Sequence, residues 1–173
     1  METAGLNPWE VVAEAFCYPA PGRLEQLEQA LAGLPAGPAT AALAAFVGKV
    51  SGLALGEWEE LHTRTLDLNP PAAPYLGFQT WGESYQRGTF LSHLNRTLID
   101  AHVDPAGELP DHLIPVLRYL GRAAEPLPEL VAVFEPAVAR MLAVLRKADP
   151  PNPYIALLEA VQALGRTLPK EAA

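Results

Sequence analysis

The side chains most suited to catalysis or metal binding in this chain of 173 residues are four histidines and a single cysteine. No two of the histidines are four residues apart, whereas a structural zinc site normally needs four clustered ligands. The chain also lacks a glycine-flanked nucleophilic serine and a glycine loop that could hold a phosphate. The sequence therefore predicts no metal, no other cofactor and no enzyme. The side chains concerned are Cys17, His62, His93, His102 and His112.

Asp111 and His112 stand together where a helix is expected to begin. An aspartate at such a position can accept hydrogen bonds from the first free backbone N–H groups, so Asp111 is expected to be the N-cap. The neighbouring imidazole is expected to be solvated. The pair lies in the segment 108–120, ELPDHLIPVLRYL, where an acidic loop with a proline leads into an apolar helix.

Carboxylates are concentrated in the middle of the chain. Residues 57–112 contain nine of them against three arginines, which gives this segment a charge of −6 out of a net charge of −8 for the whole chain. An acidic surface disfavours nucleic acid as a partner and attracts a partner with a basic face. Glu59, Glu60 and Glu83 are therefore candidates for a surface that binds a basic peptide, although a plain solvated face explains them equally well.

Aromatic residues follow in the segment 57–88, EWEELHTRTLDLNPPAAPYLGFQTWGESYQRG. Its prolines prevent helical continuation, so residues 67–82 are expected to form a loop that carries Tyr75, Phe78 and Trp81. So many aromatic residues in a loop indicate packing or a binding surface. Four aromatic residues are, taken singly, more typical of the core than of ligand contacts: Trp58, Trp81, Tyr85 and Tyr119.

The spacing of apolar residues predicts helices throughout and no strands. Asn7 is expected to cap the first helix, which runs to about Tyr18, and Asn152 is expected to cap the last. Pro136 should kink or split the helix that contains it. The length and the 50% hydrophobic composition fit one all-α domain over residues 1–173, a bundle of short helices punctuated by 18 prolines. The remaining helices are expected at about 24–34, 43–50, 57–68, 83–102, 111–120 and 130–145.

The sequence also indicates a compartment. Cys17 has no second cysteine to pair with, so it fits a reducing environment and is expected to be a buried small hydrophobic residue. The N-terminus METAGLNPWE lacks the pattern of a secretory signal. Residues 29–48 are free of charge but are broken by Pro35 and Pro38, so no transmembrane segment is expected. We therefore expect a cytoplasmic protein without direct membrane insertion.

In order and spacing, the segments 57–88 and 108–120 resemble the NarJ/TorD family of molybdoenzyme assembly chaperones. The DLNPP loop and the WGE-x-Y-x-RG helix start are similar to the respiratory nitrate reductase branch of that family. From the first segment to the last, the resemblance spans over a third of the chain. The chain departs from the pattern at Leu109, where relatives can have proline.

The resemblance implies an all-helical chaperone that binds the apo catalytic (alpha) subunit of a respiratory nitrate reductase through that subunit's N-terminal, leader-like segment. The client would lay an apolar helical face in a groove while its basic residues meet the acidic rim, before insertion of the molybdenum cofactor. In the family, the element that matches residues 108–112 engages the client and holds two halves of the fold together. The residues expected to bind the client are Glu59, Glu60, Tyr75, Trp81, Glu83, Tyr85, Arg87, Glu108, Pro110, Asp111, His112 and Tyr119.

Two alternatives from other classes stay open, and so does the oligomeric state. The aromatic residues at 75–81 could hold a nucleotide or molybdopterin cofactor, which would make the chain a carrier, although a phosphate-binding loop is missing. The chain could also be a structural subunit that remains in the mature enzyme complex.

Overall fold

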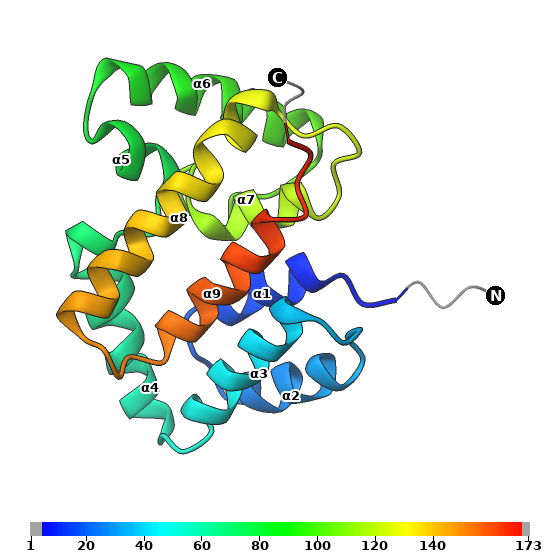
Figure 1. Cartoon of the computed structure of the whole chain (residues 1–173), viewed down its shortest axis with the longest axis vertical. Helices are drawn as coiled ribbons and strands as arrows, with labels where there is room; N and C mark the ends of the chain where they lie inside the picture. Colours follow the sequence, from blue (N-terminus) through cyan, green and yellow to red (C-terminus); the bar gives the residue numbers. More distant parts are fainter. Residues whose placement is uncertain (1–4, 171–173) are drawn as a thin grey trace.

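The computed structural model describes residues 5–170, apart from the side chain of Pro70, and this part of the chain is built from helices without a strand (Figure 1). A π-helix, Thr63–Asp67, continues α4, and a short 3₁₀ turn, Pro70–Ala72, comes after it. The prediction of an all-α fold is confirmed. The α-helices are α1 (Pro8–Phe16), α2 (Arg23–Ala32), α3 (Pro38–Val50), α4 (Leu55–His62), α5 (Leu76–Trp81), α6 (Tyr85–Asp100), α7 (Leu113–Leu120), α8 (Pro128–Ala148) and α9 (Tyr154–Gly165).

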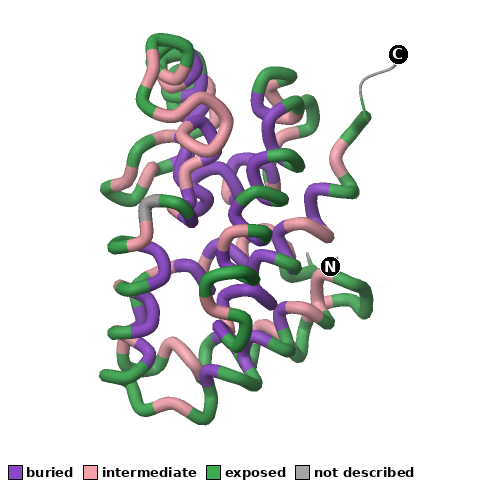
Figure 2. The backbone as a smooth tube through the Cα atoms, turned by 60° about the vertical axis from the view of Figure 1, so that its left-hand side comes forward, coloured by how far each residue is buried: buried purple, intermediate pink, exposed green. Residues whose placement is uncertain are grey.

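The longest of the described helices, α8, connects the upper and lower parts of the molecule (Figure 1). The most extensive contacts are those of α3 with α9, α1 with α7, α8 with α9, and α5 with α8. Helix α8 begins beside α6 and runs to the end of the molecule that contains α4 (Figure 1). The buried stretches of the backbone face inward in Figure 2, and their apolar side chains form one continuous core. No helix among residues 5–170 combines the length and the apolar character needed to cross a membrane.

Asparagine side chains hold the starts of the first and last helices, as predicted. Asn7 accepts a hydrogen bond from the Trp9 backbone N–H at 3.0 Å, and its amide donates to the Gly121 carbonyl at 2.7 Å. This second bond ties the start of α1 to the end of α7. Asn152 likewise accepts from the Tyr154 N–H at 2.9 Å and donates to the Thr65 hydroxyl at 2.8 Å. Both residues therefore satisfy a helix end and a distant segment at once.

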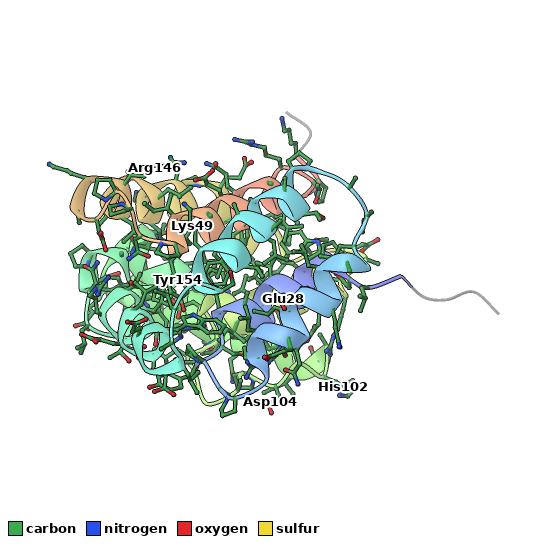
Figure 3. All side chains as sticks on the ribbon, turned by 90° about the horizontal axis from the view of Figure 1, so that it is seen from below. Glu28, Lys49, His102, Asp104, Arg146 and Tyr154 are labelled. Atoms are coloured by element: carbon green, nitrogen blue, oxygen red, sulfur yellow. The ribbon has the colours of Figure 1, made fainter. Side chains whose placement is uncertain are left out.

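Tyr154 lies at the centre of the aromatic core, where it is fully buried (Figure 3). Its hydroxyl accepts a hydrogen bond from the indole N–H of Trp58 at 3.1 Å, and its ring centroid lies 5.1 Å from that of Phe46. A buried tyrosine needs such a partner for its polar end. The expectation that Trp58 is a core residue is therefore confirmed.

Two local expectations were wrong, and of the two outcomes expected at Pro136 the structure excludes one. Residues 67–82 are not a loop throughout, because the proline-free stretch Leu76–Trp81 forms α5 and buries Leu76 against the core. Pro136 does not split α8, which is continuous across it. The side chain of Pro136 and the preceding turn at Ala132 are exposed, so water can satisfy the carbonyl that proline leaves free. Cys17 is only half-buried at the end of α1. Burial, and then the neighbouring Glu14, raise the pKa of its thiol.

A glycine sets how closely α9 approaches α8. A Cβ atom at Gly165 would lie 2.8 and 2.9 Å from two ring carbons of the fully buried Phe134. We expect Gly165→Ala to lower the free energy of unfolding by about 1 to 3 kcal/mol, because the surrounding core cannot move aside without cost. Gly48→Ala is the control, since it adds a methyl group with nothing within 4 Å on the exposed side of α3. It should raise stability by about 0.5 to 1 kcal/mol. Urea unfolding of both variants measures the difference, and equal stabilities would contradict the close contact.

Candidate functional site

Backbone hydrogen bonds bring the two sequence segments together. The Leu76 N–H donates to the Asp111 carbonyl at 2.9 Å, and the Leu113 N–H donates to the Pro74 carbonyl at 2.9 Å. These bonds form an isolated antiparallel bridge between Tyr75 and His112. The start of α5 is thereby fixed against the loop that leads into α7.

A buried ion pair adds a third segment. The carboxylate of Asp111 is fully buried and accepts two hydrogen bonds from Arg87 on α6, at 3.0 Å from Nε and 3.2 Å from Nη2. The Gly77 N–H donates to the same carboxylate at 3.0 Å. The two-point geometry is the strong form of an arginine–carboxylate pair. Asp111 is therefore not the N-cap of α7, because its side chain turns inward to a partner 24 residues away.

Gly77 is the residue that leaves room for this ion pair. A Cβ atom built on it would lie 2.7 Å from Oδ2 of Asp111 and 3.1 Å from Cγ of Arg87. Neither partner can retreat without breaking the pair. Any larger residue at position 77 would therefore displace the start of α5 from the carboxylate.

Two aromatic rings enclose the guanidinium of Arg87. Its central carbon lies 5.6 Å from the ring centroid of Tyr75 and 5.6 Å from that of Phe78, within the range of cation–π attraction. The hydroxyl of Tyr75 donates a hydrogen bond to Glu108 at 2.8 Å. Burial, followed by this hydrogen bond, raises the pKa of Tyr75, so the hydroxyl keeps its proton and remains a donor.

His112 is the N-cap of α7, in the place expected for Asp111. Its Nδ1 accepts a hydrogen bond from the Ile114 N–H at 3.0 Å, and its ring packs edge-on against Tyr75 at 5.1 Å between centroids. The side chain is buried, so the expectation of a solvated imidazole was wrong. Burial lowers the pKa of His112 to about 4. The imidazole is therefore neutral near pH 7, and its proton sits on Nε2 because Nδ1 is the acceptor.

An open hollow of about 400 Å³ lies beside this cluster. Its carboxylates are Asp67 and Glu83, and Glu108 lies close by, bonded to Tyr75. The positive charge of Arg87 is already paired with Asp111. The hollow therefore offers apolar surface under an excess of negative charge. It is lined by Leu66, Asp67, Ala73, Tyr75, Phe78, Glu83, Arg87 and Leu109.

The hollow continues onto a shallow surface along the first turns of α6, because both are lined by Glu83 and Arg87. Tyr85 stands on this surface and is 91% exposed. It was predicted as a client contact, and its position is open to a partner. Leu109 is also exposed, and it lies at the rim of the hollow.

The other predicted contacts lie in several environments. Trp81 is half-buried against Phe90, with 5.2 Å between ring centroids. Tyr119 is buried, and its hydroxyl accepts a hydrogen bond from the Leu127 N–H at 2.9 Å, so it is a core residue. Pro110 is half-buried beside Asp111. Glu59 and Glu60 lie on α4 and do not line the hollow.

Sequence reasoning did not select several residues that line the hollow. Phe78 was seen only as part of an aromatic segment, and Asp67 only as part of the acidic charge. Leu66 and Ala73 carry no signal of their own, since small and apolar residues are common everywhere. The useful signal was collective: the chain's acidic residues and a cluster of aromatic residues occur in the same stretch.

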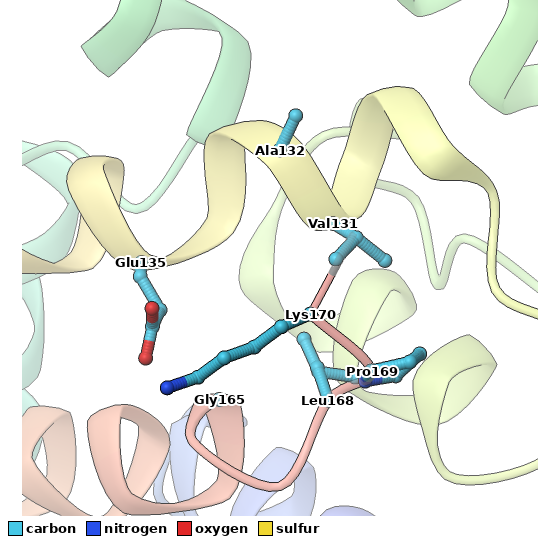
Figure 4. Close-up of a pocket in the computed structure, with 7 residues that line it drawn as sticks. All are labelled: Val131, Ala132, Glu135, Gly165, Leu168, Pro169 and Lys170. Carbon is cyan, nitrogen blue, oxygen red and sulfur yellow. The ribbon is translucent and has the colours of Figure 1, made fainter. Parts of the chain in front are cut away.

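A second hollow, of about 350 Å³, lies between α8 and the segment after α9 (Figure 4). Lys170 extends across it toward Glu135, and the rest of its lining is apolar. It contains no residue of the segments 57–88 and 108–120. Across residues 5–170, no three His, Cys, Asp or Glu side chains gather closely enough to hold a metal ion.

Comparison with known proteins gives this chain no family by similarity. No family model matches it, and no curated protein matches it significantly.

The burial of His112 makes stability depend on pH. Its pKa is about 4 in the folded protein and 6.5 ordinarily, so between these values the unfolded chain binds a proton that the folded chain does not. The free energy of unfolding should therefore hold its full value above about pH 6.5 and fall by up to about 3 kcal/mol toward pH 4. His112→Asn keeps an N-cap acceptor and removes the titration.

The comparison that checks this is denaturant unfolding of the native chain and His112→Asn at several pH values between 4 and 7.5. Other groups titrate in both proteins, so only the difference between them reports His112. The native chain should lose stability relative to the variant as the pH falls. A difference that does not change with pH would show that His112 is not buried as a neutral ring.

Proposed function

We propose that this protein is a cytoplasmic, system-specific chaperone for the apo catalytic subunit of a respiratory nitrate reductase. It binds the N-terminal segment of that subunit and keeps it competent until the molybdenum cofactor is inserted. The observation that carries the proposal is that three resembling elements, the DLNPP loop, the GESYQRG helix start and the ELPDH loop, all contribute residues to one acidic and apolar hollow.

The chemistry of the hollow supports a peptide with mixed character. Tyr75, Phe78 and Leu109 offer apolar and aromatic surface to one face of an amphipathic helix. Asp67 and Glu83 attract basic side chains on the same peptide. An open, partly apolar surface of this kind suits reversible binding, which a chaperone needs in order to release its client.

The same charges disfavour the carrier alternative. A nucleotide or molybdopterin carries phosphate, and the hollow presents carboxylates while its arginine is already paired with Asp111. A permanent structural subunit is distinguished by its partner, since a chaperone copurifies with the cofactor-free enzyme and a subunit with the mature complex.

The buried residues of the site are unsuitable for testing client binding. Replacing Asp111 by alanine would leave Arg87 buried without its counter-charge, which typically costs about 3 to 5 kcal/mol. Loss of activity in such a variant would report the loss of the fold. Substitutions at exposed residues of the rim separate the two effects.

The test is calorimetric titration with a peptide that copies the client's N-terminal segment. We expect Asp67→Asn combined with Glu83→Gln to weaken binding about threefold to tenfold at low salt, because two attractive charges are removed. Raising the salt concentration should weaken binding by the native chain more than binding by the variant. Glu25→Gln combined with Glu28→Gln on α2 is the control, since it removes the same charge from exposed positions outside the hollow.

The proposal fails if no N-terminal client peptide binds the native chain, or if the control weakens binding as much as the rim variant does. A second readout is nitrate reductase activity in cells that depend on this protein for assembly of the enzyme. There the rim variant should lower activity while its melting curve stays that of the native chain.

A further inference from the structure

Gly88 is a glycine that the fold itself does not require. It lies inside α6, where its N–H donates to the Ser84 carbonyl at 3.2 Å, and it is exposed. A Cβ atom built on it would meet nothing within 4 Å. Glycine inside a helix is destabilising relative to alanine. The chain therefore carries this cost without a gain in its own packing.

The two preceding glycines have structural reasons that Gly88 lacks. A Cβ atom at Gly77 would collide with the carboxylate of Asp111, and Gly82 joins α5 to α6 with a φ angle of +65°, which side chains rarely adopt. Gly88 has open space above it and lies within the regular helix. A glycine of this kind is useful where another molecule comes close to the backbone.

Gly88 belongs to the shallow surface that continues from the acidic hollow. Ser84 comes four residues before it and Leu91 three residues after it, so the three lie along one face of α6. The exposed ring of Tyr85 stands beside them. This face is therefore lowest at Gly88. The surface is lined by Glu83, Ser84, Tyr85, Arg87, Gly88 and Leu91, and two of these residues, Glu83 and Arg87, also line the hollow.

The shape of this face suits a crossing helix. The distance between two packed helices depends on the side chains at their contact. With no side chain at position 88, a second helix can come closest to the α6 backbone there, and Tyr85 and Leu91 then pack against its sides. The helix α6 lies at the top edge of the molecule in Figure 1, so a second helix can reach it from outside.

The charge of the surface selects the same occupant as the hollow. Glu83 is exposed and lies where the two surfaces meet, whereas the charge of Arg87 is paired with Asp111. Negative charge beside apolar side chains attracts an amphipathic helix that carries basic residues. The hollow and the face of α6 thus form one continuous surface for a single segment.

We propose that the client segment binds as a helix that crosses α6 at Gly88, with apolar side chains against Tyr85 and Leu91 and a basic residue near Glu83. The crossing rests on the proposed function, because the helix is the client segment itself. It adds a residue that determines which segments fit. A side chain at position 88 opposes binding by its bulk, which distinguishes it from the charges of the rim.

The test is calorimetric titration of Gly88→Ala and Gly88→Leu with the peptide that copies the client's N-terminal segment. Binding should weaken at least about fivefold for alanine and about thirtyfold for leucine, because the new side chain holds the helix away. Neither variant should unfold at a lower urea concentration than the native chain, since both residues are better helix formers. Gly48→Ala, which also points into open space, is the control and should bind like the native chain.

Two further measurements separate bulk from charge. The effect of Gly88→Leu should be the same at low and high salt, whereas that of Asp67→Asn combined with Glu83→Gln should shrink as salt rises. In a series of peptides, one large apolar residue at a time is replaced by alanine. One of these peptides should bind Gly88→Leu more tightly than the unmodified peptide does, and its altered position marks the crossing.

Unchanged binding by both Gly88 variants would overturn the crossing and leave the proposed function in place. The same holds for a Gly48→Ala control that weakens binding equally, and for a peptide series without any rescue. Absence of binding to the native chain would overturn both proposals, so the native titration distinguishes the two failures.

Discussion

The ion pair between Arg87 and Asp111 holds α5, α6 and the loop before α7 together. Two charges are taken out of water here, which is costly unless every hydrogen-bonding position is used. The cost is offset by a two-point contact, a third hydrogen bond from the Gly77 N–H, and two aromatic rings around the guanidinium. Because these partners come from α5, α6 and the loop before α7, the pair fixes three segments whose apolar contacts alone would allow them to slide.

The hollow is formed in part by the same residues that surround this ion pair. Tyr75 and Phe78 flank the guanidinium and at the same time line the hollow. Because the positive charge of Arg87 is paired with Asp111, it does not balance the negative charges of Asp67 and Glu83 at the rim. One buried interaction thus sets both the shape and the charge of the surface that we assign to client binding.

The sequence predicted the helices well because their signals are local. Asn7 and Asn152 mark helix starts by their own chemistry, and the apolar spacing of α8 is regular over five turns. The six-residue helix α5 was missed because such a short segment is not stable by itself and forms only when Leu76 is buried by the rest of the fold. Whether α5 forms is therefore determined by tertiary contacts, which the local sequence does not show.

At the site, too, local signals were predicted correctly and the effects of tertiary contacts were not. Tyr75, Glu83 and Arg87 were chosen from the sequence, but the cap expected at Asp111 is formed by His112. The preference of aspartate for helix starts is a local rule, and Arg87 is 24 residues away, so the rule cannot include it. Once Asp111 turns inward, the cap falls to His112, whose ring is then covered by Tyr75.

The π-helix after α4 marks a place where the length of the chain can vary. In this segment the Leu68 N–H donates to the Thr63 carbonyl, five residues earlier, so one more residue is wound into the turn than an α-helix would hold. Deleting one residue of this turn would restore an α-helical turn and leave the following residues at nearly the same angle about the axis, because five π-helical residues turn through about the same angle as four α-helical ones. The chain can therefore shorten by one residue here without moving the hollow, whereas a deletion inside the regular part of α4 would rotate every residue after it by about 100°.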